Sequence, residues 1–221
     1  MKFVIVPVKD LSMAKERLSS LLPQQQRTEL AYAMLEDVLK ALKGSRLADR
    51  KFIVTLDKKA IEMANAIGIE VIPETEQNGE SASVDYASRL SIDMGATSVL
   101  VIPGDAPLIT SEDIDFVLDK EKDGPSIVFV PARDEYGTNA ILRKPPDAIP
   151  SMFGDDSFNK HKNLAEKKNI PYACYENPRI GLDIDRPEDL VEFVSQKSDT
   201  RTYGELERLN LIEKIKEASG D

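Results

Sequence analysis

The sequence has one cysteine, one histidine and no tryptophan among 221 residues. A single cysteine cannot close a disulfide within the chain, which excludes a small secreted scaffold held together by disulfides. One cysteine and one histidine also cannot build a structural zinc site, because such a site needs four ligands. Any metal must therefore be held mainly by carboxylates, a donor set that favours a hard cation such as Mg²⁺.

Positive charge is scarce as well, because 29 Lys and Arg stand against 39 Asp and Glu and give a net charge of −10. Binding to duplex nucleic acid requires a basic surface, so we expect no nucleic-acid partner. No apolar run approaches the roughly 20 residues of a membrane-spanning helix, and the apolar start is too short for a signal peptide. We therefore expect a cytoplasmic protein without a membrane partner.

Short apolar stretches alternate with stretches of helical period along the first 130 residues. The apolar stretches are nearly continuous, which is typical of strands covered on both faces. This alternation predicts an α/β fold, a three-layer αβα sandwich with a mostly parallel, Rossmann-like central sheet. The expected strands are residues 3–8, 52–56, 70–72, 99–102 and 127–130, and the expected helices between them are residues 24–43, 58–67, 81–94 and 112–120.

The remaining chain continues the same pattern with more proline, and it contains no repeat or flexible linker. We expect one domain over residues 1–221, with a terminal helix over residues 202–217 in which Thr202 and Glu205 form a capping box. The apolar face of this helix packs either on the core or on a second subunit, and we expect a homodimer. The other expected elements are strands 138–142 and 172–175 and helices 159–168 and 187–196.

A basic loop follows the first expected strand, where open parallel sheets bind their ligands. Lys9, Lys15 and Arg17 lie within nine residues of one another in an otherwise acidic chain. Three cations at a strand end are suited to a triphosphate, although an ordinary solvated loop would look similar. The segment lacks the GxxxxGK[ST] pattern, so it is not a Walker-type phosphate loop.

Three aspartates are candidates for binding a metal. Gly104 and Asp105 follow the fourth expected strand, where Gly104 permits close approach of a ligand to the backbone. Asp183 and Asp185 point the same way if their segment is extended, and Mg²⁺ is commonly held by one or two carboxylates together with substrate phosphates. Asp105 could alternatively be a turn residue, and Asp185 could cap a helix that begins at Pro187.

Two further segments are suited to a small anion. Thr138 and Asn139 follow a glycine and offer side-chain and backbone donors. Ser157 stands where a helix is expected to begin, so the free N–H groups around it can bind an anion. His161 lies one turn further along this helix and either contacts the ligand or is a surface or supporting residue.

The motifs VPVKDLSMAKERL, PGDAPL, GTNA, FGDDSFNKH and LDIDRPEDL occur in this order. Together they resemble the 2-phospho-L-lactate guanylyltransferase family, from Phe3 to about Val194. That resemblance implies a GT-A-like nucleotidyltransferase fold. It also implies that GTP and 2-phospho-L-lactate give lactyl-2-diphospho-5'-guanosine and pyrophosphate, a step in making coenzyme F(420). Related members use phosphoenolpyruvate instead.

Under this reading, GTP and a small phosphorylated hydroxy acid are the partners, and Mg²⁺, for which Mn²⁺ can substitute, is the cofactor. Lys15, Arg17 and Asp105 are the expected catalytic residues. The loop after the third strand would line the base and ribose, and Glu80 would accept hydrogen bonds from guanine. The nucleotide-binding residues are Lys9, Lys15, Arg17, Gly79, Glu80, Ser81 and Gly104; the metal ligands are Asp105, Asp183 and Asp185; and the acceptor-binding residues are Thr138, Asn139, Ser157 and His161.

Three alternatives remain. The protein could be another Mg²⁺-dependent nucleotidyltransferase, with a molybdopterin or a sugar phosphate as acceptor. It could be a GT-A glycosyltransferase, although a nucleotide sugar needs fewer cations than the basic loop provides. It could also be a non-catalytic nucleotide-binding module.

Overall fold

A computed structural model describes residues 1–76 and 78–219, with the side chains of residues 216–219 left undescribed. Its centre is a seven-stranded sheet in the order β3-β2-β1-β4-β6-β5-β7. The strands are β1 (Lys2–Pro7), β2 (Arg50–Thr55), β3 (Glu70–Pro73), β4 (Ser98–Val101), β5 (Ser126–Pro131), β6 (Thr138–Lys144) and β7 (Tyr172–Cys174). All neighbours are parallel except β6, which is antiparallel to both β4 and β5.

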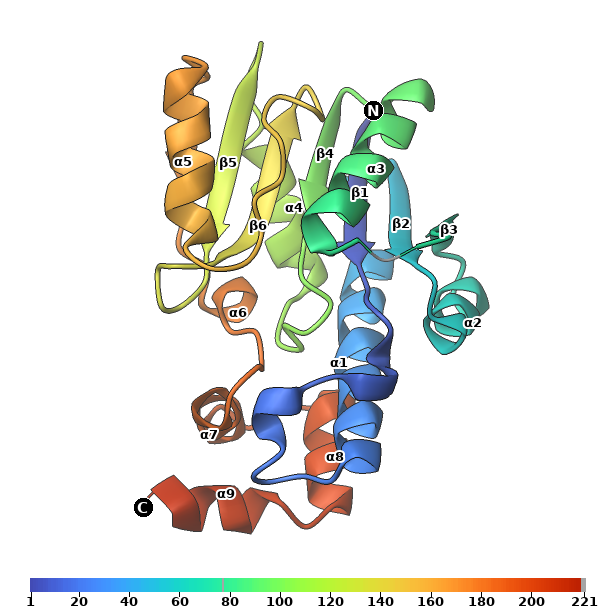
Figure 1. Ribbon diagram of the computed structural model, residues 1–221, viewed down its shortest axis with the longest axis vertical. Coiled ribbons are helices and arrows are strands. Elements are labelled where there is room, and N and C mark those ends of the chain that lie inside the picture. The colour runs from blue at the N-terminus through green and yellow to red at the C-terminus, as the bar shows by residue number, and fades with distance from the viewer. Residues whose placement is uncertain (77, 220–221) are drawn as a thin grey trace.

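Helices cover both faces of this sheet, so the predicted three-layer α/β sandwich is confirmed (Figure 1). One face packs against α1 (Gln24–Gly44), α2 (Lys58–Ala66) and α4 (Ser111–Asp119), and the other packs against α3 (Glu80–Asp93) and α5 (Ser157–Lys167). Successive strand residues alternate between the two layers, which explains why the strands are apolar throughout. For example, Val4 and Val6 belong to one cluster while Phe3 and Ile5 belong to the other.

The remaining helices lie at the end of the sheet where β1 ends (Figure 1). They are α6 (Pro178–Gly181), α7 (Pro187–Ser195), α8 (Arg201–Arg208) and α9 (Ile212–Ser219). Two 3₁₀ turns between β1 and α1, η1 (Leu11–Met13) and η2 (Glu16–Leu18), lie at the same end. Within the described part of the chain, no helix has the length and apolar character that crossing a membrane demands.

The C-terminal segment differs from the prediction, because the single expected helix is two helices. Asn210 adopts a left-handed backbone with φ +53°, and Leu211 N–H donates to the Leu206 carbonyl, which ends α8 and turns the chain into α9. The N-cap residue of α8 is Thr200, whose side chain accepts from Tyr203 N–H. The Thr202 hydroxyl donates to Asp37 on α1 instead of capping the helix. The predicted capping box of Thr202 and Glu205 is therefore wrong.

The apolar side chains of α8 and α9 pack on the core of the same chain. Leu206, Ile212 and Ile215 join a third buried cluster that also contains Leu18 and Ile184. Leu18 follows the basic loop, and Ile184 lies between two of the candidate metal ligands. The C-terminal helices consequently support the segments that carry the site, and their apolar face is used within the chain rather than kept for a partner.

Candidate active site

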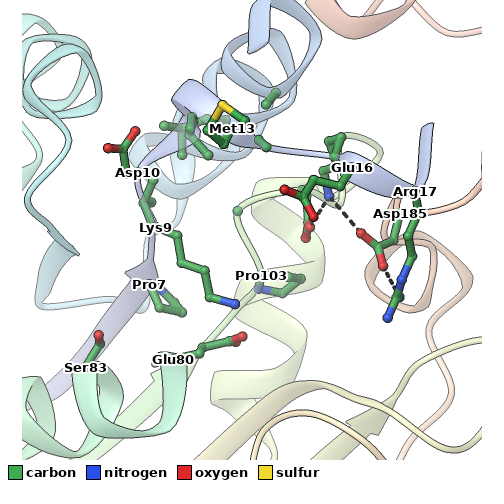
Figure 2. A pocket seen from close by; sticks show the side chains of 18 residues that line it. Pro7, Lys9, Asp10, Met13, Glu16, Arg17, Glu80, Ser83, Pro103 and Asp185 are labelled. Atoms are coloured by element: carbon green, nitrogen blue, oxygen red, sulfur yellow. Dashed lines mark hydrogen bonds and ion pairs between the residues drawn. The ribbon is translucent and has the colours of Figure 1, made fainter. Parts of the chain in front are cut away.

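The candidate site lies beyond the carboxyl ends of β1 and β4, which are neighbours in the sheet. A cavity of about 530 Å³ opens there between the basic loop, the start of α3 and the turn after β4. Figure 2 shows Lys9 and Glu80 facing each other in this cavity and Arg17 beside Asp185. The side chains that give the cavity its charge include Lys9, Lys15, Arg17, Glu80, Asp105 and Asp185.

The basic loop is anchored by one buried carboxylate. Asp57 caps α2 by accepting from Ala60 N–H at 2.9 Å, and it also accepts from Leu11 N–H at 2.9 Å in the loop. The Tyr32 hydroxyl donates to the same carboxylate at 2.9 Å. The contact between Asp57 and Leu11, 46 residues apart in the sequence, is found only in the structure.

The cations and carboxylates of the site pair with one another. Lys15 Nζ lies 2.6 Å from Asp105 Oδ2 and 3.8 Å from Asp185 Oδ1, and Arg17 forms an ion pair with Asp185. The Lys15 side chain is only 8% exposed. Burial lowers the pKa of Lys15, but the charges of Asp105, Asp185 and Asp183 and the hydrogen bond to Asp105 together outweigh this effect, so the pKa lies above its ordinary value. Lys15 therefore remains charged.

The two aspartate segments are joined through the backbone. Ile184 N–H donates to the Asp105 carbonyl at 3.0 Å, which holds the flanking Asp183 and Asp185 next to Asp105. Burial and the negative charge of Asp105 raise the pKa of Asp183 to about 6. The structure thus brings together the three predicted carboxylates, from segments about 80 residues apart in the sequence.

The chemistry of these donors fits Mg²⁺, because all are hard carboxylate oxygens. Among the residues that the structure describes, no group of three Asp, Glu, His or Cys side chains is arranged to hold a metal by itself. A metal bound here would therefore depend on further oxygen ligands from a substrate, which is the usual binding mode of Mg²⁺ at nucleotide sites.

Asp185 is free of the capping role that the sequence allows for it. The N-cap residue of α7 is Arg186, and the Asp189 carboxylate accepts from Asp185 N–H at 3.1 Å and from Arg186 N–H at 2.8 Å. Because Asp189 stabilises the start of the helix, the Asp185 side chain is left to pair with Arg17.

Thr138, Ser157 and His161 form a buried group next to Asn139 at the start of β6, and none of the three is among the residues that line the cavity. Ser157 Oγ accepts from Thr138 N–H at 2.8 Å, and Thr138 Oγ1 lies 3.0 Å from His161 Nδ1. His161 is fully buried, its Nε2 accepts from Met152 N–H, and burial and the nearby Arg143 lower its pKa to about 4. The structure gives His161 a neutral, supporting place rather than the predicted contact with the acceptor.

The start of α3 contributes one predicted residue to the cavity wall and turns another away. Glu80 lines the cavity, where burial raises its pKa to about 7 although Lys9 acts in the opposite direction. Ser81 Oγ instead accepts from Phe153 N–H at 2.9 Å. Ser83, two residues later on α3, lines the cavity. Gly79 adopts φ +94° as the N-cap of α3, a conformation that favours glycine.

A second cavity of about 680 Å³ adjoins the first, and the two share Arg17 and Asp185. Asp183, Arg133 and Arg186 also line it. Arg133 cannot be recognised from the sequence, because one arginine in a turn carries no pattern of its own.

Solved structures with similar folds include a cytidylyltransferase and other nucleotidyltransferases. A cytidylyltransferase from Leptospira borgpetersenii has a TM-score of 0.61 and 16% identity, covering 96% of this chain and 94% of that one. A protein from Desulfovibrio desulfuricans G20 has a TM-score of 0.76 and 17% identity, covering 98% and 97%. At these identities the likeness concerns the fold alone.

Sequence comparison defines the family within this class. Residues 1–221 match the family described as "Guanylyl transferase CofC like", and the chain belongs to that family. Phosphoenolpyruvate guanylyltransferase of Rubrobacter xylanophilus is 36% identical over 86% of this chain and 92% of its own length. The 2-phospho-L-lactate guanylyltransferase of Methanocaldococcus jannaschii is 32% identical over 98% and 92%. The 3-phospho-D-glycerate guanylyltransferase of Colwellia psychrerythraea is 32% identical over 85% and 88%. The resemblance inferred from the motifs is thus confirmed.

Proposed function

We propose that the protein transfers GMP from GTP to 2-phospho-L-lactate or phosphoenolpyruvate and releases pyrophosphate. With phospholactate the product is lactyl-2-diphospho-5'-guanosine, an intermediate of coenzyme F(420) biosynthesis. The observation that carries this proposal is the meeting of Lys15 and Arg17 with Asp105 and Asp185 in one cavity. Cations for a triphosphate and carboxylates for a metal are the two components that nucleotidyl transfer requires.

In the proposed reaction, an oxygen of the acceptor phosphate attacks the α-phosphorus of GTP. The bond between the α-phosphorus and the bridging oxygen breaks, and pyrophosphate leaves with the electron pair. The acceptor phosphate is already ionised at neutral pH, so the reaction needs no general base. This agrees with a cavity whose wall contains neither His161 nor Cys174.

The protein would then act by positioning the substrates and neutralising their charge. Lys15 and Arg17 would leave their carboxylate partners and bind the β- and γ-phosphates, with Lys9 beside them. Asp105, Asp183 and Asp185 would hold Mg²⁺, or Mn²⁺ in its place, which when bound neutralises charge at the transferred phosphate. This exchange keeps Asp105 and Asp185 paired with a cation before and after GTP binds.

The acceptor would approach through the second cavity, which shares Arg17 and Asp185 with the nucleotide cavity. Thr138 and Ser157 are our proposed acceptor-binding residues, because their hydrogen-bonded pair lies next to Asn139, which contacts Asp183. For the nucleotide, Gly79, Glu80 and Gly104 would lie along the ribose and base. We further propose that the enzyme works in the cytoplasm, where GTP is supplied.

The test is a pyrophosphate-release assay with GTP, Mg²⁺ and one acceptor at a time. The acceptors are 2-phospho-L-lactate, phosphoenolpyruvate, 3-phospho-D-glycerate and, as a control, mannose 1-phosphate, with mass spectrometry of each product. We expect release with phospholactate or phosphoenolpyruvate and none with the sugar phosphate. Release with mannose 1-phosphate alone would support a different nucleotidyltransferase, and no release with any acceptor would indicate a binding module.

A further inference from the structure

The side-chain amide of Asn139 donates both of its hydrogens to fixed acceptors. Asn139 is the second residue of β6 and is 9% exposed. Its Nδ2 lies 2.9 Å from Asp183 Oδ1 and 2.8 Å from the carbonyl oxygen of Ile180. An NH₂ group has two hydrogens, so these two bonds use its donor capacity completely. Asn139 therefore has no side-chain donor left for the substrate that receives GMP, which is the role predicted for it from the sequence.

The identity of the two partners fixes the orientation of the amide. A backbone carbonyl and an ionised carboxylate can only accept hydrogen bonds, so the nitrogen of Asn139 must face both of them. No shorter or apolar side chain at this position could bridge Ile180 and Asp183 with two donors. An aspartate here would place acceptor against acceptor.

The Ile180 carbonyl is itself held firmly, because α6 is tied to α4 by a buried carboxylate. Asp113 accepts from Arg179 Nε and Nη2 at 2.6 Å each and from Asn177 Nδ2 at 2.8 Å. The Asn177 side chain in turn caps α6 by accepting from Ile180 N–H at 3.1 Å. The Ile180 carbonyl that accepts from Asn139 is thus held in place by α4.

We infer that Asn139 is a positioning residue that holds the Asp183 carboxylate for the metal, an inference that rests on the proposed function. With Oδ1 engaged by Asn139, Oδ2 of Asp183 lies outside this bond. The carboxylate is fixed before any ligand arrives, so metal binding does not have to order it. Hydrogen bonds of this kind to a metal-binding carboxylate are commonly worth 10- to 100-fold, roughly, in metal affinity.

The experiment measures Mn²⁺ binding by electron paramagnetic resonance in the presence of GTP and without any acceptor, so that turnover plays no part. Asn139→Leu keeps the approximate size of the side chain and removes both donors. We expect the Kd for Mn²⁺ to rise on the order of 10- to 100-fold. In the steady state, the Mg²⁺ concentration for half-maximal rate should rise while the rate at saturating Mg²⁺ largely recovers. A merely structural defect would lower the rate at every Mg²⁺ concentration.

Three further variants make the outcome decisive. Asn159→Leu breaks a hydrogen bond of the same type, to the exposed Asp156, and should bind Mn²⁺ as the wild type does. Asn139→Ala decides the question if the leucine variant does not fold. Wild-type Mn²⁺ affinity in the folded Asn139 variants, together with weakened binding in Asp183→Asn, would overturn the inference and leave the proposed function intact. Wild-type affinity in Asp183→Asn would overturn the metal role in the proposed function and the inference with it.

Discussion

Lys15 offers the sharpest test of the site, because its backbone and its side chain make separate predictions. Its backbone is left-handed, with φ +58° and ψ +43°, a conformation that costs residues other than glycine about 1–2 kcal/mol. Its ammonium lies 2.6 Å from Asp105 and 3.8 Å from Asp185. Substitution by alanine and by glycine separates the two contributions.

Both variants lose the ion pair, and only glycine relieves the backbone. Breaking a fully buried pair is expensive, but the Asp105 side chain is 35% exposed and water can replace the lost amine, so we expect a loss of about 1–2 kcal/mol in Lys15→Ala. In Lys15→Gly the left-handed backbone is no longer strained, which raises stability. The greater conformational freedom of glycine in the unfolded chain lowers it by a smaller amount. Lys15→Gly should therefore be more stable than Lys15→Ala by about 0.5–1 kcal/mol. Urea denaturation measures this difference.

Activity should not follow this order of stability. Both variants lack the cation proposed for the leaving pyrophosphate, and we expect the rate of pyrophosphate release to fall on the order of 10²–10³ in each. Lys40→Ala, at an exposed position on α1, is the control and should retain wild-type activity. A kcat/KM close to that of the wild type in either Lys15 variant would refute the phosphate-binding role. Equal stability of the two variants would refute the argument from the backbone.

The fold was largely predictable because apolar periodicity reports burial on a sheet covered on both faces. The break between α8 and α9 was not, since Leu209, Leu211 and Ile212 continue an apolar helical pattern through it. Asn210 tolerates a left-handed backbone, but whether it adopts one depends on how Leu206, Leu211 and Ile212 pack in the buried cluster that also contains the distant Leu18. Local sequence carries no information about that contact.

The candidate site shows the same division between local and long-range information. The rule that ligands bind beyond strand ends predicts that Asp105 and the basic loop belong together. It does not predict that Asp189 takes over the start of α7, nor that Thr138 and Ser157 bond to each other. These details depend on side-chain directions across segments that meet only in the folded chain.

Three further predictions concern the carboxylates and the C-terminal helices. Asp105→Asn should lower the rate of pyrophosphate release on the order of 10²–10³ with the fold intact by circular dichroism, and near-normal activity would contradict its metal-binding role. The pKa of Glu80 is about 7 in the folded protein and 4.5 in the unfolded chain. Between these values the folded form retains a proton that the unfolded form releases, so the free energy of unfolding falls as the pH rises from 4.5 to 7. Glu80→Gln removes this effect. Measured by urea denaturation, the stability of Glu80→Gln relative to the wild type should rise from no difference near pH 4.5 to a gain of about 1–2 kcal/mol at pH 8. A difference in stability that does not change with pH would contradict the burial of the charge. Leu206 on α8 is fully buried in the cluster that contains Leu18 and Ile184, so Leu206→Ala should cost about 2–5 kcal/mol and also loosen the segments that flank the site. Leu118→Ala makes the same change at a fully buried position on α4, in a different cluster. If the C-terminal helices hold the site, the two variants lose similar stability, but only Leu206→Ala raises the KM for GTP, since a loosened basic loop must be ordered again by the nucleotide. An equal KM for GTP in both variants would show that the basic loop is held without α8.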